Sequence, residues 1–129
     1  MEIVKPIRCR VAACRRSLDD GNGWSFYLIN DSETALELAM LDKVGYEWGD
    51  SGNSVVANVR VTDLVPGAQA LIWHDDGSGA ELRMDLSLLV QMRGREVRLQ
   101  FEFPRLYQKS ILPLVDALGE PGWQVAAEG

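Results

Sequence analysis

Histidine and cysteine are scarce in this sequence, and their scarcity excludes several kinds of metal and catalytic site. The 129 residues contain one histidine, His74, and two cysteines, Cys9 and Cys14. The C-x4-C spacing is not a zinc pattern, and a zinc site would need further ligands of these types. A cupin-type metal enzyme commonly needs more than one histidine. The sequence therefore predicts no metal site and no cofactor.

Long apolar runs are also missing. No run approaches the roughly 20 residues of a membrane span. The stretch VAAC, Val11 to Cys14, looks like a lipoprotein cleavage box, but Lys5, Arg8 and Arg10 interrupt the apolar region that a signal peptide requires. We therefore expect no membrane association and a cytoplasmic location, where thiols stay reduced.

Positive charge is rare in the middle of the chain. The net charge is −6, and residues 17–90 hold 13 acidic and 3 basic side chains. An acidic surface repels phosphate backbones, so nucleic acid is not an expected partner. Residues 1–16 are basic, and we expect their charges to lie opposite acidic neighbours rather than to form a binding edge.

No pattern places a nucleophile beside a base. A serine or cysteine hydrolase needs such a pair, and His74 is the one available histidine. The acidic pairs Asp19-Asp20 and Asp75-Asp76 both fall in expected turns, where adjacent residues seldom converge on one substrate. The glycine-rich stretches lack the lysine and helix of a phosphate-binding loop. We expect a protein without catalytic residues.

The clearest feature that is present is alternation with a period of two residues. Positions Leu82 to Met92 place apolar side chains on even numbers, and Val97 to Phe103 place them on odd numbers. Arg93-Gly94 between them predicts a two-residue hairpin loop. Opposed residues then pair apolar with apolar all along the hairpin, for example Leu88 with Leu99.

The stretch WHDDGSGAELRMDL, Trp73 to Leu86, predicts a turn between two strands. A loop at Asp76–Gly79 would set residues 70–75 against the strand that follows, with Trp73 opposite Leu82 and His74 on the outer face near Glu81. An EF-hand reading fails because neither glycine register supplies the required oxygen ligands.

The remaining pattern predicts strands over 5–14, 24–30, 36–48 and 55–61, with a bulge or bend near Asp42-Lys43. Pro113 to Leu118, closed by Gly119, predicts at most one short C-terminal helical turn. About seven strands with regularly spaced turns are typical of an all-β protein. We therefore expect one domain, residues 1–129, folded as an antiparallel β-sandwich.

The only residues that indicate a function are apolar residues in unexpected places. Trp48 precedes a loop and Trp123 lies in the tail, so either could anchor a partner. Ile72 and Leu89, together with Leu41 and Val56, are expected on outer sheet faces, where a cluster would mark an association surface or a second buried layer. We expect a non-catalytic module that binds a protein or a second copy of itself.

The alternative hypothesis is a carbohydrate-binding or carbohydrate-processing module that uses exposed tryptophans. A secretion-type chaperone is a third, suggested by the small size and acidity of the chain alone.

Overall fold

The computed structural model of the chain describes residues 5–15, 23–48, 51–75, 82–105 and 112–129. Nine strands lie in this part of the chain. They are β1 (Arg8–Cys14), β2 (Trp24–Asn30), β3 (Leu36–Trp48), β4 (Ser51–Leu64), β5 (Gln69–Asp75), β6 (Arg83–Met92), β7 (Arg95–Phe103), β8 (Leu114–Val115) and β9 (Glu120–Glu128).

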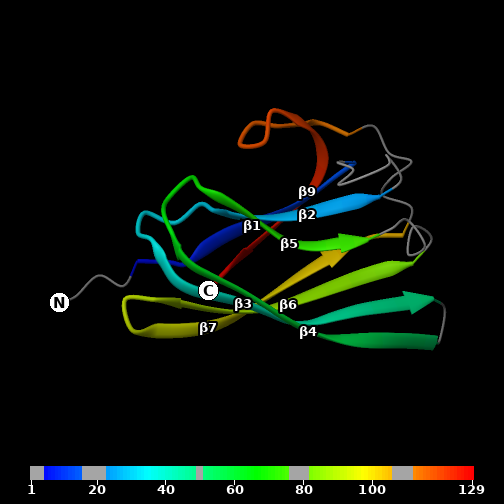
Figure 1. Cartoon of the computed structure of the whole chain (residues 1–129), viewed down its shortest axis with the longest axis horizontal. Coiled ribbons are helices and arrows are strands. Elements are labelled where there is room, and N and C mark those ends of the chain that lie inside the picture. Colours follow the sequence, from blue (N-terminus) through cyan, green and yellow to red (C-terminus); the bar gives the residue numbers. More distant parts are fainter. Residues whose placement is uncertain (1–4, 16–22, 49–50, 76–81, 106–111) are drawn as a thin grey trace.

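The strands form two antiparallel sheets that pack face to face (Figure 1). One sheet has the order β5-β2-β1-β9-β8 and the other β4-β3-β6-β7. The expected all-β antiparallel sandwich is confirmed. None of the residues that the structure describes forms a helix long and apolar enough to cross a membrane.

The core lies between the sheets and is built from the inward residues of both. The rings of Phe26 on β2 and Phe103 on β7 meet edge to face, with centroids 5.2 Å apart and planes at 85°. Leu28, Leu86 and Leu88 are completely buried in the same cluster. Burial of such side chains contributes about 1.5–3 kcal/mol each, so this layer is the main source of stability.

The β6–β7 hairpin has the predicted loop and register. Arg93 and Gly94 have φ angles of 51° and 75°, the positive pair that a type I′ turn requires. Met92 pairs with Arg95, and Leu88 pairs with Leu99. The turn and the apolar pattern therefore select the same register.

Strand β3 contains the bulge predicted near Asp42. Its registers with β4 and β6 both shift between Leu41 and Lys43. An extra residue in a strand changes which parity faces the core. Leu41, predicted on an outer face, is therefore completely buried in the core, whereas Met40 is half-buried on the outer face.

The predicted pairing of residues 70–75 with the strand after Asp76–Gly79 is wrong. Strand β5 pairs with β2, and β6 pairs with β3 and β7 in the other sheet. The chain crosses between sheets here rather than forming a hairpin. The expected loop and Glu81 lie outside the described residues.

The C-terminal region differs from the prediction in two ways. The segment expected as a helical turn forms β8 and a single turn closed by Gly119, whose φ is +68° and whose N–H donates to the Val115 carbonyl at 2.9 Å. Residues 120–128, which the sequence pattern indicated only as a tail, form β9 beside β1.

The β8–β9 turn covers the outer face of the five-stranded sheet. Val115 packs there with Ala12, Cys14 and Ile29 in a small buried cluster separate from the main core. In Figure 1 this segment is the orange-red arch above β1 and β2. A second buried layer therefore exists, but other residues than those expected form it.

Three basic residues near the N-terminus lie beside acidic partners, as expected. Arg10 contacts Asp31 at 2.6 Å, Arg8 contacts Glu128 at 3.4 Å, and Lys5 contacts Glu33 at 3.0 Å. Strand β1 lies between β2 and β9, so it is not a sheet edge.

Candidate functional site

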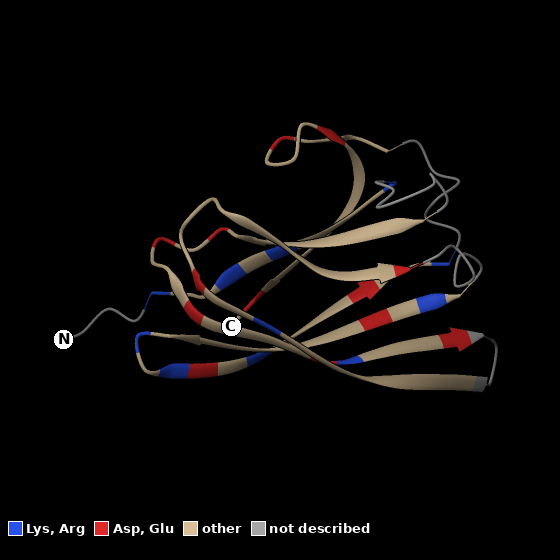
Figure 2. Ribbon diagram, in the orientation of Figure 1, with Lys and Arg blue, Asp and Glu red and all other residues tan. Residues whose placement is uncertain are grey.

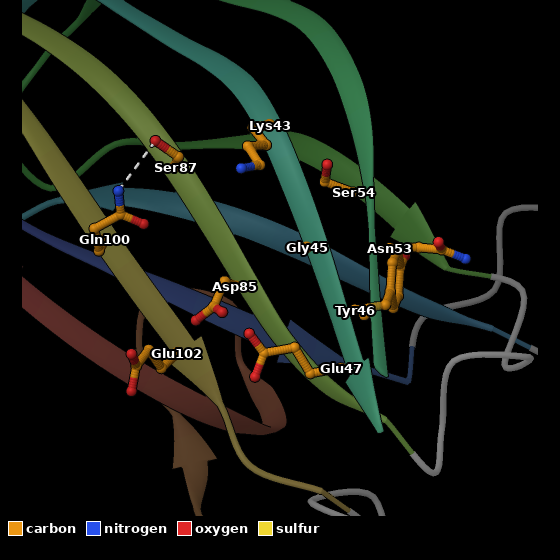
Figure 3. Close-up of a pocket in the computed structure, with 11 residues that line it drawn as sticks. Lys43, Gly45, Tyr46, Glu47, Asn53, Ser54, Asp85, Ser87, Gln100 and Glu102 are labelled. Carbon is orange, nitrogen blue, oxygen red and sulfur yellow. Dashed lines mark hydrogen bonds between the residues drawn. The ribbon is translucent and has the colours of Figure 1, made fainter. Parts of the chain in front are cut away.

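A shallow polar groove lies on the outer face of the four-stranded sheet (Figure 3). It encloses about 540 Å³. Its side chains come from β3, β4, β6 and β7, where outward positions alternate with core positions. The charged lining residues are Lys43, Glu47, Asp85 and Glu102.

The groove is dominated by carboxylates. Burial raises the pKa of Asp85 above its ordinary value, and the negative charges of Glu102 and Glu47 raise it further. Arg83 offsets this repulsion through contacts with Glu102 at 2.8 Å and with Glu47 at 3.6 Å. The groove therefore repels anions and holds one carboxylate that binds its proton more tightly than usual.

Few side chains in this groove could take part in a chemical reaction. The Ser87 hydroxyl oxygen accepts hydrogen bonds from the Arg98 guanidinium at 2.7 Å and from the Gln100 amide nitrogen at 3.3 Å, and no base lies beside it among the groove's lining residues. Among the described residues, no three His, Cys, Asp or Glu side chains are grouped so as to hold a metal ion. The groove could accept a polar or cationic group. The sequence reasoning did not identify it, although Asp85 and Ser87 as outward residues of β6 were a visible signal.

His74 lies at the edge of the five-stranded sheet and contacts Ser25. The distance between His74 Nδ1 and Ser25 Oγ is 3.2 Å. A Cβ added to Gly23 would lie 2.6 Å from the His74 ring and 2.8 Å from the Asp75 carbonyl oxygen, so glycine allows this close approach of the two backbones. The exposed position of His74 is confirmed. Its neighbours are Ser25 on β2 and Gly23, which directly precedes β2.

A hydrogen-bonded group links the sheets near one end of the sandwich. Trp73 Nε1 donates to the Tyr46 hydroxyl at 3.1 Å, and that hydroxyl donates to Asp75 Oδ2 at 3.0 Å. Asp75 is buried, and Tyr46 belongs to the opposite sheet. This arrangement fixes the two sheets to each other and uses the polar atoms of all three side chains internally.

The tryptophans do not form a shared platform. Trp24 is buried, and Trp73 and Trp123 are half-buried against the main core. Trp123 lies on β9 opposite Ala13, on the core side of the sheet. The Trp48 side chain lies outside the described part of the structure.

Ile72 and Leu89 lie in different sheets and do not meet. The register of β2 with β5 shifts between Phe26 and Tyr27, whose partners are Trp73 and Leu71. Ile72 is the residue between these partners, and it is buried in the core at 3% exposure instead of lying outside. Leu89 is half-buried on the outer face of β6, opposite Met40.

The exposed apolar residues instead gather along one side of the sandwich. The structure describes five exposed large apolar side chains, and four belong to β4, β5 or the loop between them. These four are Val55, Val56, Val65 and Leu71, with exposures of 43%, 90%, 55% and 40%. We call the surface formed by residues 51–75 the β4–β5 side.

The β4–β5 side carries almost no charge. Residues 51–74 contain one basic residue, Arg60, and one acidic residue, Asp63, in a chain of which 25% is charged. Figure 2 shows β4 and β5 as largely uncharged ribbons, in contrast to β7. An apolar and uncharged surface loses little solvation on burial, so this side is suited to contact with another protein.

Both strands of this side are sheet edges. Strand β4 has only β3 as a neighbour, and β5 has only β2. An edge strand presents unpaired N–H and C=O groups that can pair with another chain. At 14 residues, β4 is the longest strand described.

The open backbone groups of β4 can be assigned from the β6–β7 turn. Residues that flank a two-residue hairpin loop form a hydrogen-bonded pair, and bonding direction alternates along antiparallel strands. The core-facing residues of β6 therefore bond to β7 and its outward residues bond to β3. The same alternation continues across β3. The backbone N–H and C=O groups of Val55 therefore bond to β3, and those of Ser54 and Val56 point to the open edge.

The opposite edge of the same sheet is protected by charge. Strand β7 ends the sheet at the other side, and its charged residues are Arg95, Glu96, Arg98 and Glu102. Charged side chains on an edge strand discourage pairing with another chain. Residues 51–59 of β4 contain no charged residue and no proline. The sequence reasoning selected Val56 as unusual but missed this side, although the low charge of residues 51–74 was visible.

Comparisons with protein-family models, with curated proteins and with solved structures find no match to this chain.

Proposed function

We propose that this chain is a non-catalytic β-sandwich module that binds a protein partner through its β4–β5 side. The observation that carries the proposal is the coincidence of three properties on that side: two open sheet edges, four exposed apolar side chains and almost no charge. Each property favours protein contact by itself, and a surface that combines them is rare on monomeric proteins.

The strand order supports an immunoglobulin-like interpretation of the sandwich. If β1 to β7 correspond to strands A, B, C, C′, E, F and G, the sheets run A-B-E and C′-C-F-G, with the neighbours of an immunoglobulin-type domain. The chain departs from antibody domains because Cys9 and Cys14 both lie on β1 and form no bridge between sheets. Sandwiches of this class are common binding modules.

A cytoplasmic location and a protein partner fit the remaining chemistry. Both cysteines are buried thiols, which suits a reducing compartment. The net charge of −6 disfavours nucleic acid and anionic membrane surfaces. The carbohydrate hypothesis has no supporting contact, because the described tryptophans pack against the core.

The proposal is tested by capture with matched surface variants. The full chain, a Val56→Lys/Leu71→Lys variant and a Leu114→Lys control are immobilised, and proteins retained from an extract of the source cells are quantified by mass spectrometry. Leu114 is 65% exposed and lies on β8, away from the β4–β5 side. We expect a partner retained equally by the chain and the control, and retained at least about tenfold less by the double variant. Equal retention by all three would overturn the proposal.

A further inference from the structure

We propose that the occupant of the β4 edge is a second copy of this chain, whose β4 pairs antiparallel with the first to give one continuous eight-stranded sheet. This inference rests on the proposed function, because it names the partner of the same β4–β5 side.

The first argument is the chemistry of the edge itself. Residues 51–56 form a regularly paired segment of β4 without charge or proline, and Val56 is 90% exposed within it. An edge segment without charged side chains or proline lacks the features that usually block pairing with another chain. No other described edge has these properties: β5 has seven residues and ends at the charged Asp75, β8 has two residues, and β7 is charged.

The second argument is electrostatic. The net charge of −6 makes most approaches of two copies repulsive. Residues 51–74 of the β4–β5 side have a net charge of zero, so this is a surface on which two acidic copies meet with little repulsion. A basic partner would have no acidic residues to contact along residues 51–62, because this segment contains none.

The third argument is geometric. A two-fold axis through Val55 sets Ser54 of each copy opposite Val56 of the other. Ser54 and Val56 are the residues whose N–H and C=O groups face the open edge, so this register joins donors to acceptors on both sides. The interface is isologous, as a closed dimer requires. The bulge opposite Asp42, where Ala57 and Asn58 of β4 lie, limits the paired segment to its N-terminal half.

The register predicts which substitution breaks the dimer. The Val56 side chains of the two copies are diagonal neighbours, about 7–8 Å apart. A Val56→Lys substitution therefore places two like charges at the centre of the interface, whereas Val65→Lys adds the same charge on the β4–β5 loop. Proline at position 56 removes an N–H that faces the open edge and leaves the bonds to β3 intact.

Sedimentation equilibrium from about 10 µM to about 1 mM protein tests the proposal, since a short strand interface is expected to be weak. We expect the full chain and Val65→Lys to dimerise, and V56K and Val56→Pro to lower the association constant at least about tenfold. We also expect a mixture of V56K with Val56→Asp to recover dimer. Higher salt should strengthen dimerisation, because it screens the like net charges.

Circular dichroism and thermal melting confirm that each variant is folded before its mass is measured. A full chain that remains monomeric at about 1 mM, or V56K that dimerises like the full chain, would overturn self-pairing. Neither result changes the capture experiment, which decides separately whether the β4–β5 side binds a different protein.

Discussion

The bulge in β3 allows a sharp test of the core, because two adjacent residues should differ greatly in their effect on stability. Leu41 is completely buried between the sheets, and Met40 is half-buried on the outer face. Both side chains are large and unbranched at Cβ, and both residues lie in the same strand. Alanine fits the backbone conformation at both positions, so each truncation changes only the side-chain packing.

The magnitudes follow from burial. Leu41→Ala removes a fully buried side chain and leaves a cavity, so we expect a loss of about 3 kcal/mol in the free energy of unfolding. Met40→Ala removes a side chain that is partly solvated, so we expect a loss of about 1 kcal/mol. With a urea m-value of about 1.5 kcal/mol/M, the midpoints should fall by about 2 M and about 0.7 M.

Urea denaturation followed by tryptophan fluorescence measures both midpoints. Unchanged m-values would show that each substitution alters stability rather than the extent of unfolding. If Met40→Ala costs as much as Leu41→Ala, or more, then the parity of β3 before the bulge is wrong and so is the assignment of its core face.

Three further predictions concern glycine, cysteine and aspartate. A Cβ added at Gly94 meets no atom within 4 Å but has to adopt a φ of +75°, so Gly94→Ala should lower the free energy of unfolding by about 1 kcal/mol. Gly122→Ala places a Cβ 2.7 Å from Cys14 Sγ and should lower it more. Thermal melts compare the two variants. Burial, aided by the charge of Asp31, raises the pKa of Cys9 from 9.0 to about 12, so we expect an aromatic disulfide reagent at pH 8 to label Cys9 only after unfolding; rapid labelling of the folded chain would refute this. The raised pKa of Asp85, caused first by burial, means that the folded state holds this proton more tightly and loses stability as pH rises through the titration range. Asp85→Asn should therefore raise the melting temperature by roughly 1–2 °C at pH 7 and leave it unchanged at pH 3.

Local pattern predicted the β6–β7 hairpin completely. The turn residues Arg93-Gly94 and the apolar parity of both strands specify the same register, and Leu88 lies opposite Leu99 as expected. Two independent local signals that agree leave no freedom for an alternative pairing. The bulge near Asp42 was predicted for a similar reason, since a break in parity requires an extra residue.

Non-local choices could not be predicted in the same way. Parity shows that a strand has a core face but does not show which sheet contains it, so the crossing from β5 to β6 was read as a hairpin. The bulge at Ile72 reversed the expected face of that residue, because one inserted residue inverts the alternation.

Strand β9 was missed although Trp123, Val125 and Ala127 alternate with polar or small residues. Its pairing with β1 joins residues far apart in the sequence, which no local signal reports. The β4–β5 side was readable in part: the scarcity of charge in residues 51–74 is a property of the sequence, but the exposure of both edges on one side is a property of the topology.

The most direct test of the central claim is backbone amide exchange of β4, measured residue by residue by NMR at low and high protein concentration. If β4 pairs with a second copy, the amides of Ser54 and Val56 should be unprotected at about 10 µM and become protected at about 1 mM. The amide of Val55, which faces β3, should be protected at both concentrations. Protection of Ser54 and Val56 that does not change with concentration would contradict the account.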